Sequence, residues 1–127
     1  MTTQSSDNSL YHRLGGRLTV ELTVAKLYDK ILKDPLFKPF FAETRMEDLQ
    51  HSQTAFVIMA FGGPHHYKSV DLRAAHMHSK LHGLTHKHFD ATADHLADSM
   101  RELNIDEGLI DEAMAIVETT RADVLNL

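Results

Sequence analysis

Apolar residues recur at steps of three and four positions through most of the chain, and no segment alternates apolar and polar residues over the length of a strand. The first spacing is typical of one face of an α-helix, and the second would indicate a half-buried β-strand. We therefore predict an all-α fold. The expected helices begin at Ser9, directly after Gly16, at Thr44, at Arg73, at Thr85 and near Asp106.

Local signals set the expected ends of these helices. Ser9 and Thr85 are favourable N-caps, and Thr44 with Glu47 forms a capping box. Glycine permits the backbone conformation that ends a helix, and the Asp34-Pro35 step breaks the second helix. The segment from 64 to 73 has no clear period, so we interpret it as a loop.

The predicted helices carry apolar stripes that mark their buried faces. Two polar residues interrupt these stripes, Tyr28 in the second helix and Gln53 in the third. A buried amide or hydroxyl needs a hydrogen-bond partner, so a polar side chain at either position indicates a structural or functional role. The expected buried residues are Val20, Val24, Leu27 and Ile31; Leu49, Gln53, Phe56, Val57 and Ala60; Phe89, Ala93, Leu96, Met100 and Leu103; and Leu109, Ala113, Ile116 and Val117.

Length and composition narrow the class of protein. The 127 residues are enough for one domain, which we place at 9–127 after a flexible polar tail at 1–8. The formal net charge of −5 and the lack of a basic run argue against nucleic acid as a partner. We expect no membrane span and no signal peptide, hence a cytoplasmic protein. The chain has no Cys, so a metal must be held by His or carboxylate.

Histidine is unusually frequent, with ten in the chain and a dense tract between His76 and His88. Residues two apart on a helix lie roughly 200° apart, so the whole tract does not form one site. His78 and His82 share a face and could weakly chelate a transition metal at the surface, but solvent-exposed helix residues are the simpler interpretation of the two. His76 follows Ala74-Ala75, small residues that let a partner approach closely, and it is a candidate axial ligand for haem iron. Taken alone, a core or surface histidine with an ordinary hydrogen bond explains it more simply.

Tyr28 and Gln53 form a second candidate site. A ligand such as O2 on haem iron carries partial negative charge, and a hydrogen-bond donor in a dry pocket stabilises it. Both side chains can donate. A simple Tyr28–Gln53 hydrogen bond that satisfies two buried groups is the alternative, and their spacing does not decide between the two.

From Ser9 to Asn126 the sequence resembles the group I truncated haemoglobins, the two-on-two helical globins. The resemblance rests on the order and spacing of several short motifs: LYHRLGG at 10–16, the Tyr in VAKLYDKIL, Phe40-Phe41, QTAFVIMAFGGP at 53–64, RAAH at 73–76, GLTHKHFDA at 83–91, and the closing DVLN. It implies a helical sandwich around haem b.

The resemblance also implies roles for individual residues. His76 becomes the proximal iron ligand, Phe41 packs on the haem face, and Tyr28, Leu49 and Gln53 surround the distal ligand. Other predicted cofactor-binding residues are Phe56, Val57 and Leu96 in the pocket, and Tyr67 and Arg73 near the propionates. Ser52 and Thr120 stand where some relatives carry a His, one ligating iron and the other bonding covalently to haem, so neither feature is expected here.

Relatives with this distal set are associated with oxidation of nitric oxide to nitrate. The implied ligands are O2, NO and CO, and because no flavin or nicotinamide motif is present, turnover needs an external reductase. Tyr28 and Gln53 are the candidate catalytic residues. Two alternatives stay open: O2 or NO binding, storage or sensing without turnover, and a haem-free His-rich metal-binding protein.

Overall fold

The computed structural model describes residues 9–40, 46–64, 76 and 83–127. Every regular element in these ranges is helical, which confirms the all-α prediction. In chain order the elements are α2 (Leu10–Leu14), α3 (Arg17–Lys33), the 3₁₀-helix η1 (Pro35–Phe40), α4 (Met46–Ala60), α6 (His86–Glu102), α7 (Glu107–Glu118) and α8 (Arg121–Leu125).

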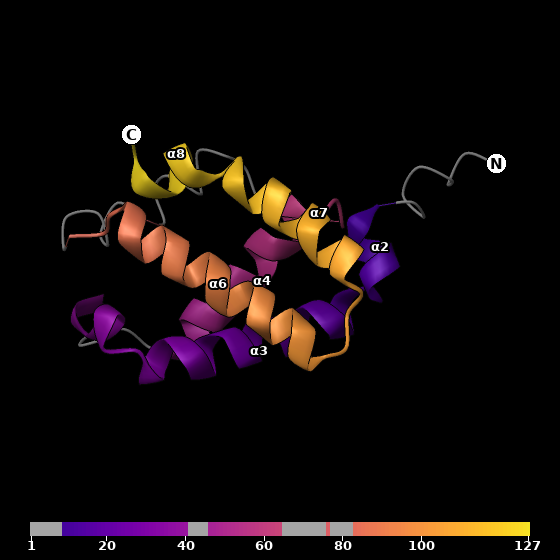
Figure 1. Cartoon of the computed structure of the whole chain (residues 1–127), viewed down its shortest axis with the longest axis horizontal. Helices are drawn as coiled ribbons and strands as arrows, with labels where there is room; N and C mark the ends of the chain where they lie inside the picture. The colour runs from indigo at the N-terminus through magenta and orange to yellow at the C-terminus, as the bar shows by residue number, and fades with distance from the viewer. Residues whose placement is uncertain (1–8, 41–45, 65–75, 77–82) are drawn as a thin grey trace.

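The long helices pack around α3 and α6. α3 contacts both α4 and α6, while α6 also contacts α7 and α8. Figure 1 shows α3 and α6 side by side, with α4 behind them and α7 on the other side of α6. The short helix α2 packs on α3 and α7 and so closes the end of the molecule near the N-terminus.

Helix ends follow the local signals in the sequence. The Ser9 hydroxyl accepts the His12 N–H at 3.2 Å at the start of α2. Gly15 ends α2 with a φ of +116°, in the left-handed region where glycine avoids a steric penalty. Asp34 caps α3, and Thr85 precedes α6. These four boundaries are confirmed.

The core forms where the predicted stripes of α3 and α6 meet. The α3 residues Val20, Val24, Leu27 and Ile31 are all 4% exposed or less. On α6, Phe89, Leu96 and Met100 are buried, whereas Ala93 and Leu103 are half-buried. The helical period therefore predicts the inward face of both helices, and the two disagreements lie at its edge.

The buried face of α4 differs from the prediction. Thr54, Ile58 and Phe61 are buried, whereas Gln53 and Ala60 are half-buried. The end of α4 turns toward α2, because the Tyr11 N–H donates to the Phe61 carbonyl at 2.9 Å. Gly63 continues this close contact: a Cβ there would lie 2.7 Å from the Tyr11 ring. Packing against α2 therefore shifts burial toward Ile58 and Phe61.

The C-terminal region also departs from the prediction. Ile110 is fully buried, while Leu109, Ile116 and Val117 are half-buried. A further helix, α8, follows α7 and buries Val124 and Leu125. Its five residues are too few to produce a periodic signal.

Some sequence predictions fall outside the described residues. These are the tail at 1–8, the Thr44–Glu47 capping box, the loop after Pro64 and most of the helix predicted from Arg73 to His82. Among the described residues, no helix is both long and apolar enough to cross a membrane.

Candidate functional site

Tyr28 is buried in the apolar stripe of α3, as predicted, and 5% of its surface is exposed. Its hydroxyl makes no hydrogen bond with any residue in the described part of the chain. Burial raises the pKa of the Tyr28 phenol well above its usual value, because the phenolate would lose its hydration. The hydroxyl therefore keeps its proton at neutral pH and can donate a hydrogen bond to a ligand.

Gln53 lies on α4, the helix that packs against α3. It is half-buried, which corrects the expectation of full burial. The Tyr28–Gln53 hydrogen bond that the sequence left open is not formed, since neither side chain bonds another described residue. Both polar groups are therefore available to a ligand.

Three further predicted residues form apolar surroundings. Phe56 is 8% exposed, and Val57 and Leu96 are each 4% exposed. Phe56 and Val57 lie on α4, and Leu96 lies on α6. Leu49 belongs to α4, but the structure does not describe its side chain. The predicted site residues Phe41, Tyr67 and Arg73 lie outside the described residues.

His76 is helical and half-buried. By contrast, His51 on α4 is exposed, which agrees with the prediction that it points away from the pocket. His78 and His82 lie outside the described residues, so the idea of a metal site between them stays a prediction. Within the described ranges, no group of three His, Asp or Glu side chains is placed to hold a metal ion.

Two other histidines act in packing. His88 Nδ1 accepts the Thr85 N–H at 3.1 Å and so caps α6. His95 Nε2 lies 2.8 Å from Asp34 Oδ2, joining α6 to the end of α3. The sequence analysis missed this second pair, because its partners are 61 positions apart and no local motif links them.

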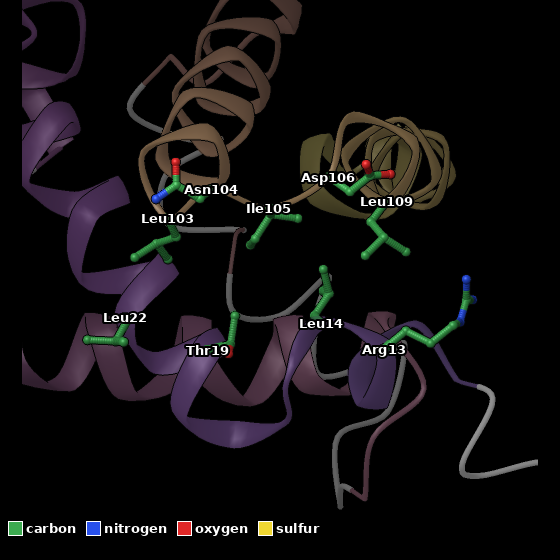
Figure 2. Close-up of a pocket in the computed structure, with 9 residues that line it drawn as sticks. All are labelled: Arg13, Leu14, Thr19, Leu22, Leu103, Asn104, Ile105, Asp106 and Leu109. Carbon is green, nitrogen blue, oxygen red and sulfur yellow. The ribbon is translucent and has the colours of Figure 1, made fainter.

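A surface pocket of about 360 Å³ lies elsewhere, where the α2–α3 corner meets the turn between α6 and α7. Figure 2 shows Leu14, Ile105 and Leu109 pointing into it, with Arg13 and Asp106 at its margin. None of the predicted site residues lines this pocket. It is therefore not the candidate ligand site.

The residues present fit haem. Histidine is a common axial ligand of haem iron, and a chain without Cys offers no thiolate in its place. A ligand pocket needs a mostly apolar lining with a few polar groups that fix orientation. Buried Phe56, Val57 and Leu96 supply the apolar part, and the Tyr28 hydroxyl is a donor still lacking an acceptor within the described chain.

Comparison with known proteins places the chain in a family. The family model for bacterial-like globins matches residues 9–126. The chain is 42% identical to a group 1 truncated haemoglobin from Chlamydomonas moewusii, covering 94% of this chain and 69% of the relative. It is 38% identical to one from Synechocystis, covering 94% and 98%.

Solved structures agree. The 2/2 haemoglobin from Synechococcus sp. PCC 7002, determined with covalently attached haem, superposes with a TM-score of 0.85 at 42% identity over 94% of this chain and 99% of that one. Truncated haemoglobin from Tetrahymena pyriformis gives 0.83 at 36% identity over 93% and 98%. The fold is thus that of the two-on-two globins, and the chain belongs to the bacterial-like globin family, among the group 1 truncated haemoglobins.

Proposed function

We propose that the chain binds haem b through His76 and oxidises nitric oxide to nitrate with O2. Membership of the family implies haem-based binding of small ligands, and the finer claim is ours. The observation that carries it is the buried, protonated Tyr28 hydroxyl, which has no hydrogen-bond partner among the described residues. Such a donor lowers the energy of a bound gas that carries negative charge.

Haem, held by His76, would supply an iron that binds O2 and gives up one electron when NO and O2 combine to nitrate. An external reductase must return that electron, since the chain shows no flavin or nicotinamide motif. Tyr28 donates a hydrogen bond to the gas, and Gln53 acts as a second donor from α4. Phe56, Val57 and Leu96 keep water out, which strengthens both hydrogen bonds.

The remaining predicted contacts are part of the same proposal. Phe41 and Leu49 line the haem, and Tyr67 and Arg73 bind the propionates. The cytoplasmic location and the reductase stay predictions.

Turnover separates catalysis from simple binding. We expect the oxygenated ferrous protein to consume NO with one nitrate formed per NO, and to continue for many cycles when a flavodoxin or ferredoxin reductase system supplies electrons. Tyr28→Phe should lower the rate of NO consumption, because O2 leaves sooner and less of the protein is oxygenated.

Stoichiometric oxidation that stops after one cycle, with the iron readily reduced again, would support O2 or NO binding, storage or sensing instead. A purified protein that takes up no haem but binds Ni²⁺ or Zn²⁺ would support the haem-free metal-binding alternative.

A further inference from the structure

The start of η1 is held against α6 by a set of polar and aromatic contacts. It comprises the η1-side residues Asp34, Phe37 and Phe40 and the α6 residues His88 and His95. We call this set the η1 clasp. None of the five belongs to the predicted ligand site, and their contacts join parts of the chain more than forty positions apart.

The clasp follows from helix geometry. A 3₁₀-helix has three residues per turn, so side chains three apart lie on one side. Phe37 and Phe40 have this spacing within η1, and Asp34 directly precedes the helix. His88 and His95 are seven apart, close to two turns of an α-helix, and so share a face of α6. Two matching rows of side chains therefore meet along this contact.

Asp34 uses both carboxylate oxygens. Oδ1 accepts the Leu36 N–H at 3.0 Å and turns the chain into η1. Oδ2 lies 2.8 Å from His95 Nε2, so the histidine must carry a proton on that nitrogen. The hydrogen bond from His95 holds the pKa of Asp34 below its usual value, which keeps the carboxylate charged. Both side chains are about a quarter exposed.

The aromatic contacts extend the clasp to the end of η1. The buried Phe37 ring lies 5.8 Å from the His88 ring and 6.4 Å from the His95 ring, measured between centroids. The Phe40 ring meets His88 at 4.9 Å with an interplanar angle of 80°, an edge-to-face arrangement. His88 is itself fixed by the Thr85 N–H. Phe40 is thus tied to a rigid point on α6.

We propose that the η1 clasp fixes the end of η1 on α6, and that Asp34 and His95 are positioning residues for haem retention. The inference rests on the proposed function, in which the next residue, Phe41, packs on haem. Releasing η1 from α6 removes the fixed point from which the chain continues to Phe41. The expected consequence is faster haem loss.

The test measures haem transfer from the ferric holoprotein to excess apomyoglobin. Asp34→Asn keeps an oxygen for the Leu36 N–H and removes the charge that faces His95. We expect transfer to accelerate about tenfold, which corresponds to about 1.4 kcal/mol. His95→Leu should act similarly, and His95→Gln, which keeps an N–H donor, should restore most of the retention.

Glu102→Gln provides a matched control. Glu102 also joins α6 to α3, through Lys30 Nζ at 2.6 Å and Lys26 Nζ at 3.5 Å, and its pKa is likewise lowered by that pairing. We expect the haem transfer rate of Glu102→Gln to stay within about twofold of the wild-type rate. The urea midpoint for unfolding of the apoprotein should shift by a similar small amount in Asp34→Asn and in Glu102→Gln.

Each result bears on the inference. Faster haem transfer in Asp34→Asn and His95→Leu, but not in Glu102→Gln, supports the proposed role of the η1 clasp. Equal acceleration in Glu102→Gln would mean a general loosening of α3 against α6 and would overturn it, as would an unchanged rate in Asp34→Asn. If the wild-type protein binds no haem, both the proposed function and the role of the η1 clasp are wrong. If it binds haem tightly and all variants transfer haem at the wild-type rate, only the role of the clasp is wrong.

Discussion

Tyr28 carries a phenol in a helix face that is otherwise filled by apolar side chains. Burial keeps its proton in place by raising the pKa, and no described residue accepts its hydrogen bond. No side-chain polar atom in the described ranges is both fully buried and without a partner, so the Tyr28 hydroxyl itself stays accessible at the surface of its apolar surroundings. A ligand that accepts a hydrogen bond from this hydroxyl gains affinity from it.

Replacing Tyr28 with Phe keeps the ring and removes the donor. Hydrogen bonds to charged groups are worth roughly 1.5–3 kcal/mol, so O2 should dissociate about ten- to a hundredfold faster in stopped-flow experiments. CO, whose oxygen carries little charge, should be far less affected. Gln53→Leu should have a smaller effect, less than additive with Tyr28→Phe if Gln53 acts through Tyr28.

Tyr11→Phe is the matched control, since Tyr11 is also buried, at 7% exposed, but lies on α2 outside the predicted site. Its O2 dissociation should equal that of the wild type. An unchanged rate in Tyr28→Phe would remove Tyr28 from the mechanism.

Thr120 is the residue on which the prediction of non-covalent haem rests. Its hydroxyl donates to the Val117 carbonyl at 2.7 Å, and it offers no imidazole for a covalent bond. We therefore expect acidified butanone to extract all haem, and denatured protein to have the mass of the bare polypeptide. Haem that stays with the denatured chain, as in a covalently modified relative, would contradict this expectation.

At the scale of elements, one ion pair ties α2 to α7. Arg13 contacts both carboxylate oxygens of Glu112, at 2.9 and 2.5 Å. The hydrogen bond from Arg13 lowers the pKa of Glu112, so the folded state binds this proton less readily than the unfolded state. The pair therefore stabilises the fold above the unfolded pKa of about 4.3, and this contribution is lost as the pH falls through the lower folded pKa.

Thermal unfolding of Glu112→Gln should test the pair. We expect a lower midpoint than the wild type at pH 7, and a difference that shrinks toward zero as both proteins are acidified below about pH 4. Both side chains are 41% exposed, so the effect should be small and should weaken in high salt. A difference that persists or grows in acid would show that the amide disturbs packing instead.

Local chemistry makes several elements predictable. Ser9, Gly15, Asp34 and Asp106 act at helix ends through their own side chains or backbone, so the sequence alone locates those ends. α8 is different. Arg121 joins it to Asp90 on α6 at 2.5 Å and lies over the Phe89 ring, contacts that no short window of sequence contains.

At the scale of the whole molecule, the same distinction applies to the site. Tyr28 could be identified because a polar residue interrupts an apolar stripe. The burial of Ile58 and Phe61 could not be predicted from the sequence, because it depends on where α2 lies across α4. The Asp34–His95 pair likewise exists only once η1 and α6 meet. Local rules therefore predict helices and single unusual residues, while contacts between distant helices require the fold.

An absorption spectrum together with a haem assay will show whether His76 holds haem iron. The purified wild-type protein should be red, with a Soret band and one haem per chain. His76→Gly should lose tight haem binding, because the axial nitrogen is removed, whereas the exposed His51→Ala, together with His78→Ala and His82→Ala, should retain the wild-type haem content. A colourless wild-type protein, or equal haem content in His76→Gly and the three controls, would contradict the account.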